Sequence, residues 1–205
     1  MQYPLAALAE AGFVLRDDDL LRQRRPTYRL ADPILRFHHA VTRPDLARFE
    51  DHRTDEAWAD AEERFRSQVL GPQFEQVARD FTARYASADL LGGVASRVGR
   101  AVVNDAGARA THEVDVVAID TRARRQIPRV VVLGEAKYSQ RRCTLDDVRR
   151  LERIRGLVAA RRDVDAASAR LALFSASGFD AELTGLAHRR DDIVLVDLDT
   201  IYGSP

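Results

Sequence analysis

Three acidic residues and one lysine lie on two predicted strands. Glu113 and Asp115 are separated by two positions, as are Glu135 and Lys137. Side chains alternate between the faces of a strand, so the members of each pair point to the same side. If the two strands form a hairpin, Asp115 and Glu135 converge at one end of it, beside the backbone carbonyl of Ala136.

This arrangement suits a hard divalent cation. Mg²⁺ takes oxygen ligands, usually one or two carboxylates together with waters and substrate phosphate. We therefore expect Asp115, Glu135 and the carbonyl of Ala136 to hold Mg²⁺ or Mn²⁺. Such an ion lowers the pKa of a bound water and stabilises charge on a phosphoryl group. Lys137 would orient the attacking water or offset the developing charge.

Lys137 is the only lysine in the chain, since the 32 basic residues are 31 arginines and one lysine. A composition bias that replaces lysine by arginine would leave lysine where an ammonium is needed, because the compact ammonium and the broad guanidinium are not equivalent. The alternative is an ordinary ion pair between Lys137 and Glu135 on one face of a strand, worth under about 1 kcal/mol when exposed.

Helices and strands that would position these residues follow Gly71-Pro72, where we place a domain boundary. A helix with an apolar stripe comes first, and hydrophobic patterning then predicts strands and helices in the order α-β-β-β-α-β-α-β. The strands are expected near 97–103, 113–119, 129–136, 171–174 and 193–197. Thr144, with Asp147 three residues later, predicts a capping box at the start of the helix that connects the third strand to the fourth. Residues 71–205 are thus expected to form an α/β domain with a mixed central sheet flanked by helices.

The first seventy residues predict a different organisation. Residues 1–30 read as a helix closed by Gly12 and then a two-stranded hairpin, which is the back half of a winged helix. Residues 31–70 predict a helical linker that begins at Pro33 after an Asp32 N-cap and breaks near Pro44.

Charge is distributed unevenly along the chain. From 139 to 162 there are eight arginines and three acids. The five that follow the proposed site could contact a phosphate backbone, and they are Arg141, Arg142, Arg149, Arg150 and Arg153. The segment Arg22-Gln23-Arg24-Arg25 could do the same from the wing. The run 51–63, with six acids and one arginine, is most simply a solvated helix face.

Composition excludes several classes of protein. The 205 residues carry 32 acidic and 32 basic side chains, and 45% are apolar, which argues against a disordered chain. No apolar run reaches the ~18 residues of a membrane span, and no secretory signal follows Met1. The single cysteine, Cys143, excludes an internal disulfide and a cysteine-based zinc site. We expect a cytoplasmic protein with no membrane partner.

The order of these residues resembles a known family. Asp115, followed about twenty residues later by Glu135-Ala136-Lys137, resembles the PD-(D/E)XK nuclease motif, and Glu75 matches the helix glutamate that often joins that site. More broadly, the chain resembles the C-terminal region of archaeal-type P-loop ATPases, the domain of unknown function of type 234. The segments that carry this likeness are Tyr28-Arg29-Leu30-Ala31-Asp32-Pro33, Gly71-x-x-Phe74-Glu75, His112-Glu113-Val114-Asp115, Gly134-Glu135-Ala136-Lys137 and Leu173-Phe174-Ser175-x-x-Gly178-Phe179.

The resemblance implies a nuclease-like fold in which Asp115, Glu135, Lys137 and Glu75 are catalytic, normally attached to an ATPase. No P-loop motif is present, since the only lysine is followed by Tyr138. The chain therefore resembles the back end of such a protein, as a fragment or as the product of a truncated gene. Glu75 could instead pair with Arg79 at i+4. Glu113 could join the site, although we favour a nearby arginine as its partner.

Two classes of function remain open at this stage. The first is Mg²⁺-dependent hydrolysis, or binding, of nucleic-acid phosphodiesters, with DNA the favoured substrate. The second is a non-catalytic module that regulates a partner ATPase and docks through the acidic helix 51–63, or a regulator that binds DNA through the wing.

Overall fold

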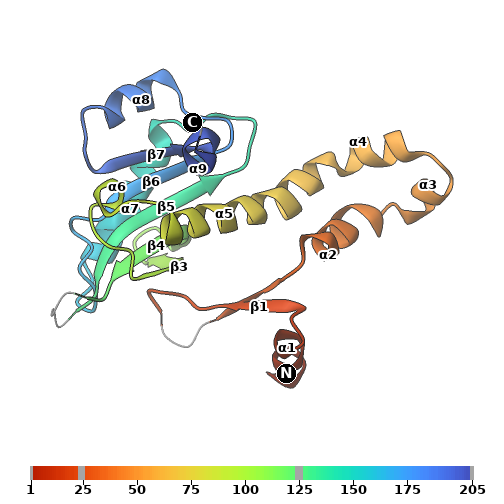
Figure 1. Cartoon of the computed structure of the whole chain (residues 1–205), viewed down its shortest axis with the longest axis horizontal. Helices are drawn as coiled ribbons and strands as arrows, with labels where there is room; N and C mark the ends of the chain where they lie inside the picture. The colour runs from red at the N-terminus through yellow and green to blue at the C-terminus, as the bar shows by residue number, and fades with distance from the viewer. Residues whose placement is uncertain (1, 23–25, 123–126, 204–205) are drawn as a thin grey trace. The chain divides into compact units, whose positions relative to one another are not determined.

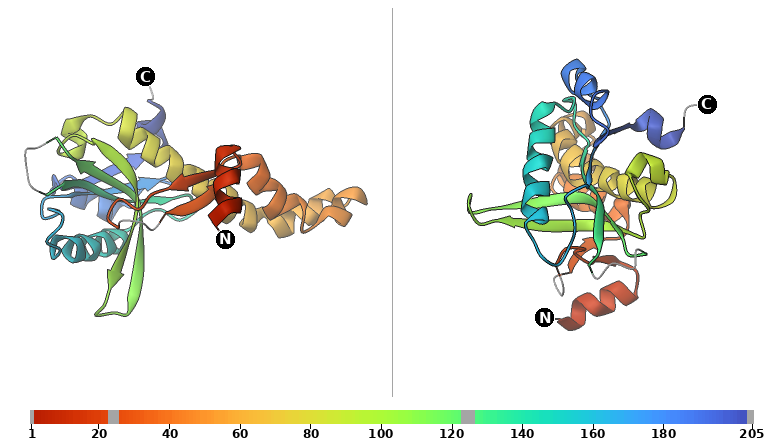
Figure 2. Two further views of the ribbon diagram at one scale, coloured as in Figure 1. Left: turned by 90° about the horizontal axis from the view of Figure 1, so that it is seen from below. Right: turned by 90° about the vertical axis from the view of Figure 1, so that its left-hand side faces the viewer.

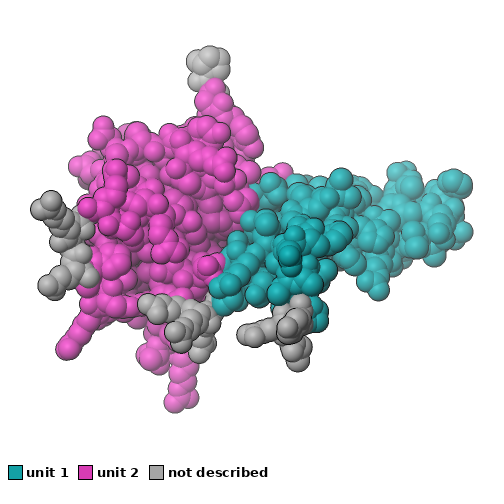
Figure 3. All heavy atoms as spheres, turned by 60° about the horizontal axis from the view of Figure 1, so that its bottom comes forward, with its two compact units in different colours: residues 1–17, 26–74 teal, residues 18–25, 75–205 magenta. Residues whose placement is uncertain are grey.

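The structure, a computed structural model, describes residues 2–22, 26–122 and 127–203. The chain divides into two compact units, which Figure 3 colours separately. Unit 1 comprises residues 1–17 and 26–74, and unit 2 comprises residues 18–25 and 75–205. The chain therefore passes from one unit to the other three times.

Unit 1 begins with the predicted helix and hairpin. Helix α1 (Gln2–Glu10) ends at Gly12, whose positive φ of 78° is the left-handed conformation that favours glycine after a helix. Strands β1 (Val14–Asp17) and β2 (Thr27–Leu30) then pair antiparallel. Helix followed by hairpin is confirmed.

The remainder of unit 1 is helical. Asp32 caps the next helix as predicted, because its side chain accepts a hydrogen bond from the Ile34 amide at 2.8 Å. A break at residues 43–45 separates two helical groups, in agreement with the predicted break at Pro44. The elements are α2 (Pro33–Phe37), the π-helical turn η1 (His38–Thr42), α3 (Leu46–Glu50), α4 (Thr54–Phe65) and the π-helical turn η2 (Arg66–Leu70). Their core contains Ala40, Val41, Ala61 and Val69, with Phe49 and Phe65 packed against it.

Helix α5 (Gly71–Arg84) follows η2 directly, so the predicted boundary at Gly71-Pro72 is itself helical. The contact-based division of the chain falls between Phe74 and Glu75. Pro72 is the second residue of α5 and directly follows Gly71, the C-cap residue of η2.

Unit 2 is built on a five-stranded mixed sheet with the order β3-β4-β5-β6-β7. The first three strands are antiparallel neighbours, and the last two run parallel to β5. All five lie within a few residues of the predicted positions, namely β3 (Arg97–Asp105), β4 (Ala110–Asp120), β5 (Arg129–Lys137), β6 (Arg170–Ser175) and β7 (Ile193–Asp197). The prediction of an α/β fold with a mixed sheet flanked by helices is confirmed.

Helices cover both faces of this sheet. Helix α7 (Leu145–Ala159) and the 75–84 part of α5 lie on opposite sides in the right-hand view of Figure 2. The α7 side holds the main core, which joins Val148, Leu151, Ile154 and Val158 to Val117, Leu133, Leu171 and Leu173. On the other side the rings of Phe81 and Phe174 meet edge to face at 6.4 Å between centroids. The short helices of this unit are α6 (Ala88–Leu91), α8 (Ala181–Ala187) and α9 (Leu198–Tyr202).

After β1 the chain joins unit 2, where Asp19 and Leu20 lie along the outer edge of β3. The Leu20 amide donates to the Arg100 carbonyl at 3.0 Å, and the Val102 amide donates to the Asp19 carboxylate at 3.0 Å. Three consecutive aspartates fit a turn, but one of them bonds an edge-strand amide, which sequence alone did not reveal.

Candidate active site at the end of the β4–β5 ladder

The two predicted carboxylates stand where β4 and β5 stop pairing. The last backbone pair of the ladder is Val116 with Gly134, so Asp115 and Glu135 are the first residues past it on each strand. The Ala136 amide donates to the Asp115 side chain at 3.0 Å, while the Asp115 carbonyl accepts from Arg79 Nη1 at 2.9 Å. Side-chain bonds thus replace the ladder here and keep the two carboxylates on neighbouring strands.

Glu135 is buried, with an exposed fraction of 8%. Its Oε1 forms an ion pair with Arg150 of α7 and lies 3.7 Å from Lys137 Nζ. Its Oε2 is also buried and has no hydrogen-bond partner among the described residues. A buried acceptor without a partner carries a desolvation cost, so this oxygen is available to a ligand.

Lys137 is held between two carboxylates. Its ammonium pairs with Asp147 of α7 as well as with Glu135. Asp147 also closes the predicted capping box, because its other oxygen accepts from the Thr144 amide at 2.8 Å. Burial alone would lower the Lys137 pKa, but the hydrogen bond to Asp147 and the charge of Glu135 raise it. Lys137 is therefore a fixed cation at neutral pH.

Glu75 approaches the site from α5. Its Oε2 lies 3.6 Å from Arg79 Nη1, so the i+4 pair that the sequence left open is present. The same buried Arg79 holds the Asp115 backbone, which ties the helix to the site strand. Glu113 pairs with Arg100 at 3.2 Å, as we favoured, and is mostly exposed.

Three carboxyl groups share one electrostatic property. Burial raises the pKa of Glu75, and the negative charge of Asp115 raises it further. Burial also raises the pKa of Asp115, against the opposing hydrogen bond from Ala136. For Glu135, burial raises the pKa against the opposing charges of Arg150 and Lys137. Burial is the first cause in all three groups, and buried carboxyls with raised pKa values are typical of functional sites.

A divalent oxygen-binding cation fits these residues as a two-carboxylate site. The donors are all oxygens, and the partnerless Oε2 of Glu135 lies next to the strand that carries Asp115. Within residues 2–22, 26–122 and 127–203, no group of three or more acidic, histidine or cysteine side chains is placed to hold an ion by itself. Mg²⁺ needs only one or two carboxylates, with waters and substrate phosphate as the other ligands.

The five arginines predicted to contact nucleic acid fall into two groups. Three are engaged within the protein: Arg149 with Asp146, Arg150 with Glu135, and Arg153 with Asp105. Arg141 and Arg142 have exposed side chains that make no ion pair or hydrogen bond with any residue the structure describes. Of the wing segment, Arg22 donates to Asn104, and residues 23–25 lie outside the described residues.

Sequence reasoning missed Asp147 and Arg150 as members of the site. Both lie one helical turn apart on α7, on the side that faces Glu135 and Lys137. The sequence predicts helix capping for Asp147 and a nucleic-acid contact for Arg150. Their i, i+3 spacing places both on one face of the helix, but it does not tell which strand that face covers.

Comparisons with protein-family models, with curated proteins and with solved structures gave no match. None of the helices in the described part of the chain combines the length and the apolar content that crossing a membrane requires.

Proposed function

We propose that unit 2 is a metal-dependent nuclease domain that hydrolyses nucleic-acid phosphodiesters, with DNA as the favoured substrate. One observation carries the proposal. Asp115 and Glu135 follow the last pair of the β4–β5 ladder, and a buried oxygen of Glu135 has no partner there. The order of motifs that resembles PD-(D/E)XK nucleases supports the same reading and adds Glu75.

Asp115 and Glu135 would hold Mg²⁺ or Mn²⁺, with the Ala136 carbonyl as a further oxygen ligand. When bound, the ion supplies Lewis acidity toward the phosphoryl group and a more acidic water. Asp115 is oriented for this task by the amide of Ala136. Lys137 is positioned by Asp147 and would hold the attacking water by donating hydrogen bonds, or offset charge on the phosphate. Glu75 would bind a water of the metal, and Arg79 fixes its carboxylate.

The resemblance carries two further proposals. Residues 1–30 would be the back part of a winged helix, which the observed helix and antiparallel hairpin support. A P-loop ATPase would be the partner of the chain, because family members join such a domain to the nuclease-like region.

A cleavage assay with plasmid and single-stranded DNA tests the catalytic proposal. We expect cleavage that requires Mg²⁺ or Mn²⁺ and is abolished by EDTA, by Asp115→Ala and by Glu135→Ala. Glu113→Ala is the matched control, since Glu113 lies two residues from Asp115 but pairs with Arg100. Cleavage that persists in both site variants, or equal loss in Glu113→Ala, would contradict the assignment.

Binding of the ion can be measured without any substrate. Adding Mg²⁺ or Mn²⁺ should raise the melting temperature of the parent protein and of Glu113→Ala, because a ligand that binds only the folded state stabilises it. The same addition should leave Glu135→Ala unchanged. Equal stabilisation of all three proteins would place the ion elsewhere.

The alternative, a docking module that acts through the acidic helix, gains no support from the structure. Three acids of α4 pair with arginines of unit 1, namely Asp60 with Arg48, Glu56 with Arg53, and Glu62 with Arg66. A docking face would present charge that is not already matched. The direct test is charge reversal at Asp55, which should leave any ATPase association unchanged.

A further inference from the structure

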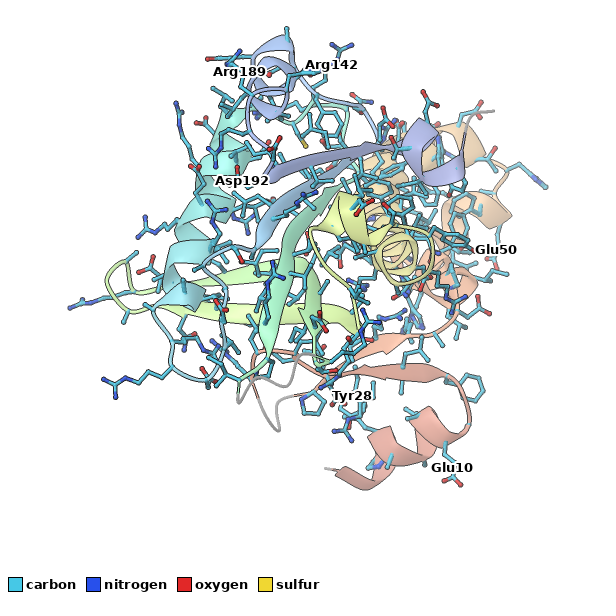
Figure 4. All side chains as sticks on the ribbon, turned by 60° about the vertical axis from the view of Figure 1, so that its left-hand side comes forward. Glu10, Tyr28, Glu50, Arg142, Arg189 and Asp192 are labelled. Carbon is cyan, nitrogen blue, oxygen red and sulfur yellow. The ribbon has the colours of Figure 1, made fainter. Side chains whose placement is uncertain are left out.

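A second feature of unit 2 lies at the carboxyl ends of β6 and β7. A pocket of about 550 Å³ opens there, within the range of ligand sites in proteins. Its walls come from the loop before α7, the loop after β6, helix α8 and the end of β7. Figure 4 shows Arg142 beside α8, at the margin of this pocket.

The two charged side chains that line this pocket, Arg142 and Asp197, form no ion pair with any described residue. Arg142 has no ion pair or hydrogen bond through its side chain among the described residues, although the pocket also contains Asp197. One oxygen of Asp197 accepts from the amide and hydroxyl of Thr200, at 2.8 and 2.6 Å. The pocket therefore offers a free guanidinium for an anion and a carboxylate that can accept from a ligand amine.

The other walls are apolar or weakly polar. Phe179 and Leu195 supply a ring and an aliphatic surface. His188 Nδ1 lies 2.8 Å from the Thr184 carbonyl, which can only accept, so Nδ1 carries the hydrogen. In the neutral ring Nε2 is then an acceptor.

Backbone bonds fix the wall that carries the cation to the wall that carries the ring. The Cys143 amide donates to the Gly178 carbonyl at 3.1 Å, and the Asp180 amide donates to the Cys143 carbonyl at 3.1 Å. Arg142 and Phe179 are each one residue from these bonds. The backbone segments that carry the guanidinium and the ring are thus held together before any ligand arrives.

This pocket lies at the same end of the sheet as the carboxylate site, where β5, β6 and β7 reach their carboxyl ends. Lys137 pairs with Ser175 on β6, and Ser175 pairs with Asp197 on β7. Two interstrand steps separate Lys137 from Asp197, roughly 10 Å between their backbones. A strand of nucleic acid that places a phosphate at the carboxylates would reach the pocket with a nearby nucleotide.

We propose that this pocket binds one unpaired nucleotide of a single-stranded nucleic acid, with its phosphate at Arg142 and its base against Phe179 and Leu195. The proposal rests on the proposed nuclease function for the identity of the substrate. Proteins that bind single strands combine basic groups for the backbone with aromatic rings on which bases stack, and both are present here. Asp197 and His188 Nε2 would accept hydrogen bonds from donor groups on the base edge.

Binding without metal separates this proposal from catalysis. A fluorescent hexathymidylate is titrated in EDTA with the full chain, with Arg142→Gln and with Arg189→Gln, and anisotropy reports the dissociation constant. Arg189 is the matched control, because it is an exposed arginine next to the pocket residue His188 and does not itself line the pocket. We expect Arg142→Gln to weaken binding about tenfold or more, as for loss of a hydrogen bond to a charged group, and Arg189→Gln to change it by less than about threefold.

A second variant tests the base. Phe179→Leu keeps an apolar side chain of similar packing and removes the ring, and we expect binding to weaken about fivefold or more. Thymidine monophosphate should displace the oligonucleotide at lower concentration than inorganic phosphate does. Equal effects of Arg142→Gln and Arg189→Gln, or equal displacement by phosphate alone, would overturn the pocket proposal whether or not the protein cleaves DNA. Arg142-dependent binding without Mg²⁺-dependent cleavage would support the pocket and contradict the nuclease.

Discussion

Replacing Gly134 by alanine should destabilise unit 2 and disturb the site at once. Gly134 is the β5 residue of the last β4–β5 pair, directly before Glu135. A Cβ built there would lie 3.1 Å from the Ala172 carbonyl oxygen, 3.2 Å from Val116 Cβ and 3.2 Å from the ring of Phe174. Two of these neighbours are fixed in the ladders and the ring is buried, so none can move aside cheaply.

The expected magnitude follows from two opposing effects. Overpacking a buried site by one methyl group costs about 1–3 kcal/mol. Removing the extra backbone freedom of glycine in the unfolded chain offsets about 0.5–1 kcal/mol. The net loss is about 1–2 kcal/mol, which corresponds to a melting temperature lower by about 2–8 °C for a chain of this size.

The matched control is Gly156→Ala. Gly156 is exposed within the last turn of α7, and a Cβ there meets nothing within 4 Å. Alanine is about 1 kcal/mol better than glycine in a helix interior, so this variant should melt higher than the parent. Thermal melting by circular dichroism, with urea midpoints as a second measure, distinguishes the two. A Gly134→Ala protein as stable as Gly156→Ala would refute the close packing of β4, β5 and β6 at the site.

Three other predictions test the electrostatics. Lys137→Arg keeps the charge between Asp147 and Glu135, so it should melt like the parent and yet cleave DNA about 10²–10⁴-fold more slowly, since the guanidinium cannot replace a positioned ammonium; equal rates would refute a catalytic ammonium. Asp192 (labelled in Figure 4) accepts from Arg190 and Arg155, so Asp192→Asn should lower the free energy of unfolding by about 1 kcal/mol at pH 7 in urea titrations. The hydrogen bond from Arg190 holds the Asp192 pKa well below its usual range, with support from Arg155 and in spite of partial burial. The stabilisation is therefore complete above the ordinary aspartate pKa and is lost as the pH falls toward the lower folded-state pKa. A stability difference between parent and variant that grew in acid would contradict this. Asp115→Asn should raise the melting temperature in EDTA at neutral pH, because burial raises the Asp115 pKa and the ionised form is disfavoured in the folded protein; the gain should vanish below the ordinary aspartate pKa, where the parent is protonated in both states.

The elements of unit 2 were predictable because their signals are local. Alternating and continuous apolar runs identified all five strands, and Thr144 with Asp147 identified the start of α7. The meeting of Asp115 and Glu135 also followed from strand alternation and a single assumed hairpin. These inferences need only neighbouring strands, which sequence order supplies.

Interactions between elements distant in sequence were harder to predict. The pairing of Arg150 with Glu135 depends on which way α7 faces after its crossover, and the role of Asp19 depends on the path of a loop along β3. The pocket near Arg142 requires the ends of β6 and β7 to be in register with that of β5. Each depends on tertiary packing that no short pattern encodes.

The single lysine makes the proposed site chemically addressable. Lys137 carries the one side-chain amine of the 205 residues, and a third of that side chain is exposed. Reductive methylation with ¹³C-formaldehyde would label this amine and the α-amine of the chain while retaining the positive charge of each. The Lys137 methyl resonance, which Lys137→Arg would remove, comes from a position between Asp147 and Glu135 and would shift when an ion or a phosphate binds beside them. A spectroscopic reporter is thus available without introducing or removing any residue.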